Sequence, residues 1–94
     1  MPEYDLAERI THAAEALKGL GAAEVYIFGS AATGEMRPDS DVDIAVRGLP
    51  PREFFRAMGL AWDILGRPVD LLRLDAGSRL ARYLEDKGKL QRVG

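Results

Sequence analysis

The segment DVDIAV, residues 41–46, restricts the possible fold more than any other feature of this sequence, because its branched apolar side chains alternate with polar or small ones. A period of two residues is typical of a β-strand, in which successive side chains point to opposite faces of the sheet. The two valines and the isoleucine therefore share one face, whereas Asp41 and Asp43 share the other. The chain thus needs a sheet with one buried face and one face that carries two carboxylates.

The rest of the chain predicts two further strands and three helices. Apolar residues recur every three to four positions in the helical segments, and β-branched or aromatic residues fill the strand segments. The predicted elements are, in order, a helix over 5–18, a strand over 24–28, a loop over 29–40 with a helical turn after Ser30, the strand over 41–46, a helix over 51–65, a strand over 68–74 and a helix over 78–87. Trp62 falls on the apolar face of its helix and is expected in the core. Leu80, Tyr83 and Leu84 form the apolar face of the last helix, where Tyr83 is expected to pack with its hydroxyl in water. The tail after residue 87 predicts no element.

This order of elements predicts an α/β (α+β) fold. We expect a small mixed β-sheet of about three strands, with helices packed mainly on one face. A chain of 94 residues is the size of one domain, so residues 1–94 are predicted to form a single domain. The pattern leaves the directions of the first two strands open, because the loop between them could join antiparallel strands or cross over.

Composition excludes several classes of function. The sequence has 13 Lys and Arg residues and 15 Asp and Glu residues, which gives a net charge of −2. This charge argues against direct nucleic-acid binding by bulk positive charge. No apolar run approaches the roughly 20 residues of a membrane span, and the acidic N-terminus lacks a secretory apolar region, so we expect no membrane partner and a cytoplasmic location. With no Cys and only His12, disulfides and Cys- or His-rich zinc sites are excluded. Chemistry would rest on carboxylates, hydroxyls and arginines.

The main candidate site is a pattern of Gly29-Ser30, ten further residues, and then Asp41-x-Asp43. Two carboxylates on one face of a strand lie roughly 6.5–7 Å apart at the backbone and repel each other unless a cation neutralises them. Two divalent cations ~3.5–4 Å apart are used for in-line displacement at phosphorus. Because only hard oxygen ligands are present, Mg²⁺ is the expected metal.

Other residues complete this candidate site. Gly29 allows the backbone to approach an anion closely, and the Ser30 hydroxyl adds a donor for phosphate. Arg37 and Ser40, in the same loop, are further candidates for phosphate contacts. Asp70 lies in an otherwise apolar strand, where a carboxylate is costly unless it has a role or a partner. It either joins Asp41 and Asp43 as a metal ligand or proton acceptor, or it pairs with a nearby arginine such as Arg67 or Arg73.

At these residues the sequence resembles the minimal nucleotidyltransferase family of the DNA polymerase β-like superfamily. The stretch GSAATGEMRPDSDVDIAV, residues 29–46, matches that family's signature, and Asp70 in PVDLL fits its third carboxylate. The resemblance implies the nucleotidyltransferase fold and transfer of a nucleoside monophosphate from ATP or another nucleoside triphosphate, with two Mg²⁺ ions held by Asp41, Asp43 and Asp70. It also implies an antitoxin that binds and adenylylates a small helical toxin of the HEPN type.

The sequence departs from the family pattern at Ala31 and Thr33, where relatives often carry arginine or another polar residue. Two other functions remain open at this stage. One is a non-catalytic antitoxin that acts as a binding module. The other is a small-molecule nucleotidyltransferase of the antibiotic-modifying type, for which a chain of this length leaves little room for a substrate pocket.

Overall fold

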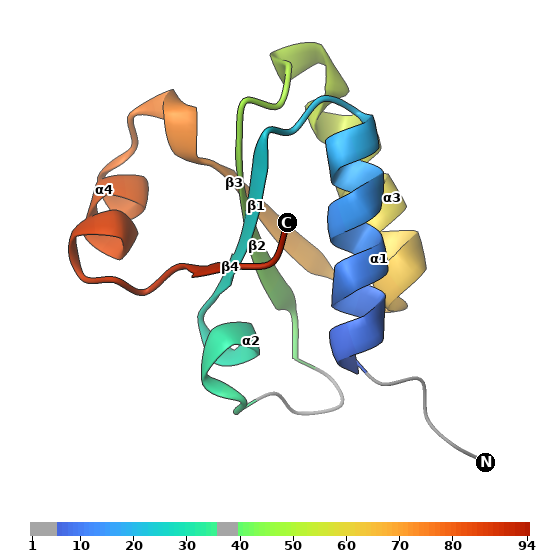
Figure 1. Ribbon diagram of the computed structural model, residues 1–94, viewed down its shortest axis with the longest axis horizontal. Coiled ribbons are helices and arrows are strands. Elements are labelled where there is room, and N and C mark those ends of the chain that lie inside the picture. Colours follow the sequence, from blue (N-terminus) through green and yellow to red (C-terminus); the bar gives the residue numbers. More distant parts are fainter. Residues whose placement is uncertain (1–5, 36–39) are drawn as a thin grey trace.

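The computed structural model describes residues 6–35 and 40–94 (Figure 1). The elements follow one another as α1 (Leu6–Gly19), β1 (Glu24–Phe28), α2 (Ser30–Thr33), β2 (Val42–Arg47), the 3₁₀ turn η1 (Pro51–Glu53), α3 (Phe54–Leu65), β3 (Val69–Arg73), the 3₁₀ turn η2 (Leu74–Ala76), α4 (Arg79–Asp86) and β4 (Gln91–Arg92). The predicted helices and strands are therefore present, and β1 has the predicted bounds, whereas other ends shift by up to three residues. Asp41 immediately precedes β2 instead of lying within it, and α3 begins after a 3₁₀ turn at Pro51.

The described residues form a mixed four-stranded sheet in the order β3-β2-β1-β4. β1 pairs with both β2 and β4 in antiparallel fashion, whereas β2 and β3 are parallel. Parallel neighbours need a crossover connection, and α3 supplies it. The structure thus settles the strand directions that the sequence pattern left open.

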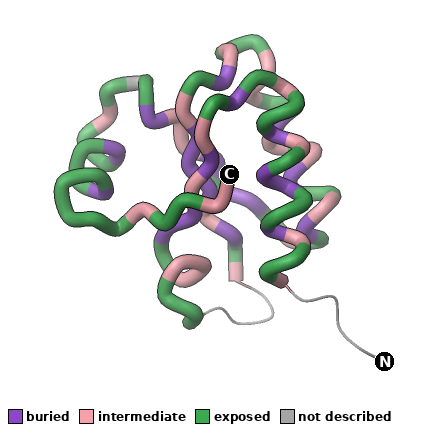
Figure 2. Tube along the Cα trace, in the orientation of Figure 1, coloured by how far each residue is buried: buried purple, intermediate pink, exposed green. Residues whose placement is uncertain are grey.

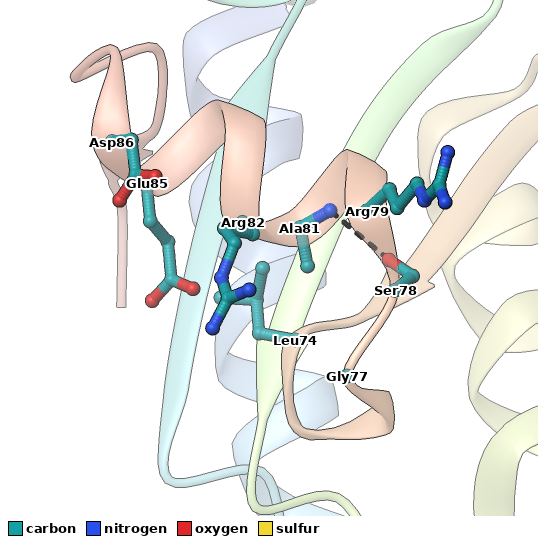
Figure 3. A pocket seen from close by; sticks show the side chains of 8 residues that line it. All are labelled: Leu74, Gly77, Ser78, Arg79, Ala81, Arg82, Glu85 and Asp86. Carbon is teal, nitrogen blue, oxygen red and sulfur yellow. Dashed lines mark hydrogen bonds between the residues drawn. The ribbon is translucent and has the colours of Figure 1, made fainter.

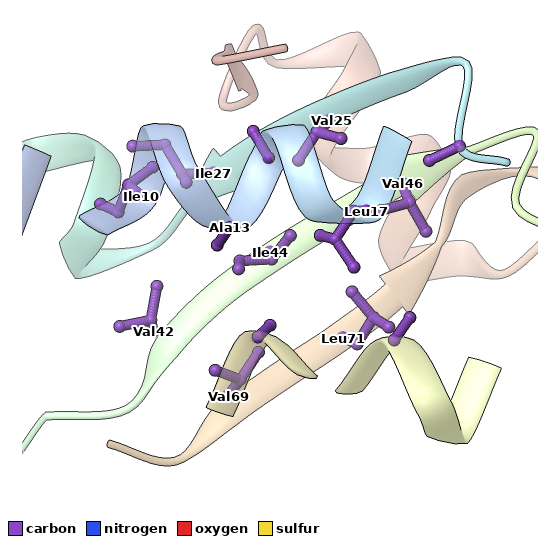
Figure 4. Close-up of a cluster of buried hydrophobic side chains, with 14 of the residues drawn as sticks. Ile10, Ala13, Leu17, Val25, Ile27, Val42, Ile44, Val46, Val69 and Leu71 are labelled. Atoms are coloured by element: carbon purple, nitrogen blue, oxygen red, sulfur yellow. The ribbon is translucent and has the colours of Figure 1, made fainter. Parts of the chain in front are cut away.

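Helices cover the two faces of the sheet unequally. In Figure 1, α1 and α3 lie together on one side of the sheet, and α4 lies on the other. The main apolar cluster lies under α1 and α3 and includes the alternating apolar residues of β2 (Figure 4). Its most deeply buried large side chains are Leu17, Ile44, Leu49, Val25, Val42 and Val46. Buried positions accordingly concentrate on the sheet and on the helix faces turned toward it (Figure 2).

The opposite face carries a smaller apolar cluster, which attaches α4 to the sheet. Phe28 and Ala45 of the sheet pack with Ala81 and Leu84 of α4. Ser78 caps the helix, since its Oγ accepts a hydrogen bond from the Ala81 N–H at 3.0 Å (Figure 3).

An ion-pair bridge adds to this attachment. Arg47, at the end of β2, pairs with Glu24 of β1 at 3.1 Å and also with Glu85 of α4. One guanidinium therefore links two strands to the helix that covers them.

The prediction of three strands was wrong by one. The tail forms the short edge strand β4, and the Val93 N–H donates to the Val25 carbonyl at 2.8 Å. A two-residue strand shows no alternation in sequence. It forms because the outer edge of β1 offers unpaired backbone groups, a non-local condition.

The predicted burial of Trp62 was also wrong, since this side chain is 46% exposed. Leu80 and Tyr83, on the predicted apolar face of α4, are likewise 50% and 52% exposed. The buried residues are Ala57, Ala61 and Leu65 in α3 and Ala81 and Leu84 in α4, so each helix turns only part of its predicted apolar face to the sheet. No helix in the described part of the chain is both long and apolar enough to cross a bilayer.

The packing of α1 generates a stability prediction. Leu17 is fully buried, so Leu17→Ala should lower the free energy of unfolding by about 2–5 kcal/mol, through lost apolar burial and the cavity left behind. Glu15→Ala, at an exposed position of the same helix, should change it by no more than about 0.5 kcal/mol. Urea denaturation followed by circular dichroism measures both. Equal effects of the two substitutions would contradict the assigned helix face.

Candidate functional site

The parallel pairing of β2 with β3 brings two of the three predicted carboxylates together. Asp43 and Asp70 are register partners across these strands. Directly paired residues of neighbouring strands project from the same face of the sheet. That face is opposite to α1 and α3 and is only partly covered by α4, so Asp70 stays exposed and Asp43 is half-buried.

Gly29 lies directly beside this pair, because Phe28, the last residue of β1, is the antiparallel partner of Asp43. Gly29 has φ +63°, which L side chains rarely adopt, and a Cβ placed on it would collide with Oδ2 of Asp43. The sequence interpretation explained this glycine by close approach to an anion. The structure adds a second reason, since the missing side chain leaves room for the Asp43 carboxylate.

The electrostatics of the site favour a cation. Burial, followed by the negative charges of Asp70 and Asp41, raises the pKa of the Asp43 carboxyl above its ordinary value. Within the described residues, neither Asp43 nor Asp70 forms an ion pair with a lysine or arginine. The structure therefore does not support the alternative in which Asp70 anchors Arg67 or Arg73.

The remaining predicted site residues lie around this centre or outside the described residues. Asp41 is exposed and lies two residues before Asp43. The Ser40 carbonyl accepts a hydrogen bond from Nη1 of Arg67 at 3.4 Å, which connects the loop before β2 to the segment before β3. Ser30 begins the single-turn helix α2. Arg37 lies outside the residues that the structure describes.

Two cavities share Phe28 as a lining residue. One, of about 210 Å³, contains Asp43 and Asp70 together with Leu72 and Leu80. The other, of about 400 Å³, contains Gly29 and Ser30. A larger cavity of about 460 Å³ lies at α4 and is lined by Arg79, Arg82, Glu85 and Asp86, among others, but by none of the predicted site residues (Figure 3). The predicted site residues that line a cavity are therefore found at the two cavities that share Phe28.

Sequence reasoning missed the residues that α4 and the following segment add to these cavities. Leu80 lines the cavity of the carboxylates, and Tyr83 and Lys89 line the cavity of Gly29 and Ser30. Helical periodicity assigned Leu80 and Tyr83 to an apolar packing face, and the tail that contains Lys89 carried no motif. Only the packing of α4 across the sheet reveals their place.

The donor set suits a divalent cation that is not fully enclosed by protein. Asp43 and Asp70 provide hard oxygen donors without a compensating protein cation. Among the residues described, no three His, Asp or Glu side chains are gathered closely enough to hold a metal ion by themselves. This arrangement fits Mg²⁺, which typically binds one or two carboxylates and completes its octahedron with water or phosphate oxygens.

The contact between Gly29 and Asp43 can be tested by paired alanine substitutions. Gly29→Ala and Gly34→Ala both place a side chain at positive φ, but only Gly29 has a neighbour within 4 Å. Gly34→Ala should therefore show only the cost of backbone strain, about 1 kcal/mol or more. Gly29→Ala should lower the melting temperature further, because the Asp43 carboxylate must also move. Equal melting temperatures for the two variants would contradict this clash.

The raised pKa of Asp43 predicts how stability depends on pH in metal-free protein. A carboxyl whose pKa is higher in the folded than in the unfolded state stabilises the fold only while protonated, so its ionisation costs stability as pH rises through that raised pKa. Asp43→Asn removes this cost. Its melting temperature relative to wild type should increase from acidic pH toward neutrality, whereas Asp63→Asn, at an exposed position of α3, should show no such trend. A constant difference across pH would disprove the assignment.

Comparison with solved structures places the fold. A structure described as a proposed minimal nucleotidyltransferase matches with a TM-score of 0.70 and 27% identity, covering 100% of this chain and 99% of that chain. A crystal structure of a toxin–antitoxin with AMP-PNP matches with a TM-score of 0.70 and 21% identity, covering 94% and 72% of the two chains. The MntA–HepT toxin–antitoxin structure matches with a TM-score of 0.63 and 18% identity, covering 95% and 69%. The last two likenesses concern the fold alone.

The sequence comparison gives the family. No curated protein sequence matches the chain significantly. Residues 10–92, however, match the family described as the nucleotidyltransferase domain, a span that includes the glycine–serine turn and all three aspartates. With the four-stranded mixed sheet and its minimal-nucleotidyltransferase neighbour, this match shows that the chain belongs to the nucleotidyltransferase domain family and is a transferase.

Proposed function

We propose that this chain, acting as one minimal domain in the cytoplasm, transfers AMP from ATP to a hydroxyl group of a partner protein, and that it is the antitoxin of a HEPN-type toxin. The observation that carries the proposal is the uncompensated pair of Asp43 and Asp70 beside the Gly29 turn. A nucleotidyltransferase must bind a polyphosphate next to a centre that can hold a metal, and these residues offer both.

The three aspartates are the proposed metal ligands. Nucleotidyltransferases of this fold generally use divalent metals, and we assign Mg²⁺, as two ions, to Asp41, Asp43 and Asp70. When bound, the metal neutralises negative charge on the carboxylates and on the phosphates. Gly29 and Ser30, with Ser40 and Arg37 from the same loop, are the proposed contacts of the nucleotide. The missing Cβ of Gly29 leaves room for the Asp43 carboxylate beside this turn.

The proposed reaction is a single in-line displacement. The acceptor oxygen forms a bond to the α-phosphorus of ATP, the bond from that phosphorus to the bridging oxygen of the β-phosphate breaks, and pyrophosphate leaves. The hydroxyl proton passes to the carboxylate of Asp70, which is the more exposed member of the pair. Asp70 thus faces the acceptor, and Gly29 and Ser30 face the nucleotide.

The acceptor is proposed to belong to a partner protein because the cavity at the carboxylates is small. Its volume of about 210 Å³ lies below the roughly 300–1,000 Å³ of typical small-molecule sites, and the half-exposed Leu80 forms one wall. An acceptor that a second protein presents needs no deep pocket. The solved toxin–antitoxin structures with this fold support a toxin as that second protein.

Intact-mass spectrometry tests the proposal. The protein encoded next to this gene is incubated with the chain, ATP and Mg²⁺, and should gain the mass of one or more AMP units. Asp41→Asn/Asp43→Asn should abolish the gain, because the metal loses the charge of two ligands. Asp63→Asn/Asp86→Asn removes the same charge at exposed positions outside the site and should retain transfer. Omitting Mg²⁺ should abolish transfer by the wild type.

A toxicity assay in cells distinguishes the other functions. Rescue by Asp41→Asn/Asp43→Asn equal to that of wild type, with no mass gain on the neighbour, would overturn catalysis in favour of a non-catalytic antitoxin. Transfer of AMP to an aminoglycoside-like hydroxyl compound but not to the neighbour would establish a small-molecule transferase instead.

A further inference from the structure

The cavity that contains Gly29 and Ser30 is also lined by residues that are distant in sequence. On one side of this space of about 400 Å³ lie the Gly29 turn and α2, and on the other lie Tyr83 and Leu84 of α4 and Lys89. The two sides are separated by about 50 residues in sequence. They meet because α4 packs on the face of the sheet that carries Asp43.

The two sides of this cavity carry opposite charges, a negative one beside the Gly29 turn and a positive one after α4. The turn and α2, residues 29–35, contribute no basic side chain, and their Glu35 is acidic and accepts a hydrogen bond from Thr33 Oγ1 at 3.1 Å. Among the described residues that line the cavity, Lys89 is the only one with a positive charge. It is exposed and forms no ion pair with any described residue.

The backbone holds Lys89 in place. The chain reverses at Gly88, whose φ is +64°, and the Lys89 N–H donates to the carbonyl of Leu84 at 2.9 Å. This hydrogen bond joins the first and last of six residues, which is the pattern of a Schellman motif at the C-terminus of a helix, here α4. Leu84 precedes this turn and lies in the smaller apolar cluster, and Leu90, directly after Lys89, packs against the same cluster. Lys89 therefore projects from a fixed point, not from a loose tail.

We infer that Lys89 binds the polyphosphate of the nucleotide and supplies the positive charge that the Gly29 turn does not provide. A polyphosphate carries several negative charges beside the carboxylates of Asp43 and Asp70, so binding needs compensation beyond the metal. A lysine ammonium serves as a strongly hydrated point charge for phosphate and needs no fixed planar geometry. The inference rests on the proposed function, because it takes the ligand of this cavity to be a nucleoside triphosphate.

Titration calorimetry with Mg²⁺ and either ATP or inorganic tripolyphosphate tests the inference on the full chain. Lys89→Met should weaken binding of both ligands about tenfold or more, because one charge-assisted contact to phosphate is lost. Lys89→Arg should retain most of the affinity. Lys87→Met is the matched control: it removes the same charge two residues earlier, at an exposed position that does not line the cavity, and should change affinity by less than about twofold.

The outcomes separate this inference from the proposed function. Wild type that binds neither ATP nor tripolyphosphate in the presence of Mg²⁺ would overturn both. Wild type that binds, with Lys89→Met equal to wild type or to Lys87→Met, would overturn only the role of Lys89. Loss of ATP affinity without loss of tripolyphosphate affinity would place Lys89 at the nucleoside and would also overturn a polyphosphate contact.

Discussion

The pairing of β2 with β3 is the constraint on which the rest of this structure depends. It is parallel, so it requires the crossover through α3, and its register places Asp43 beside Asp70. Two like charges side by side oppose folding. Apolar burial on the opposite face of the sheet offsets this repulsion, because Val42, Ile44 and Val46 of β2 are fully buried under α1 and α3. One face of the sheet thus provides stability, while the other carries a charge pair that needs a cation.

The fourth helix has a structural and a functional part in this arrangement. It partly covers the charged face through Ala81 and Leu84 and through the ion pair of Glu85 with Arg47. Leu80 and Tyr83 lie outside that apolar contact, stay half-exposed and line the two cavities that share Phe28. A rotation of α4 that buried Leu80 and Tyr83 in the apolar cluster would remove them from these cavities. The face through which α4 packs therefore shapes the site.

In the proposed reaction, this chain provides the site for the metal and the nucleotide, and a second protein provides the acceptor hydroxyl group. The described residues provide carboxylates, a glycine turn and a lysine, which are suited to a metal and a polyphosphate. The cavity at Asp70 is smaller, about 210 Å³ against about 400 Å³ for the cavity at Gly29 and Ser30. So small a cavity leaves little room for a separate small-molecule acceptor. The proposed acceptor is therefore a hydroxyl group on the surface of a partner protein.

Local sequence determined the individual elements and most of the candidate site. Alternation in residues 41–46 identified a half-buried strand, and the spacing from Gly29 to Asp43 identified the turn and the carboxylates, because side-chain direction in a strand follows from a period of two. Tertiary structure decided what depends on pairing between distant segments. The register of β2 with β3 makes Asp70 the neighbour of Asp43, and β4 pairs with β1. The packing of α4 brings Lys89 into the cavity that Gly29 lines. Each of these features depends on contacts between segments that are far apart in sequence. Such contacts leave no periodic trace in either segment, so only the folded chain reveals them.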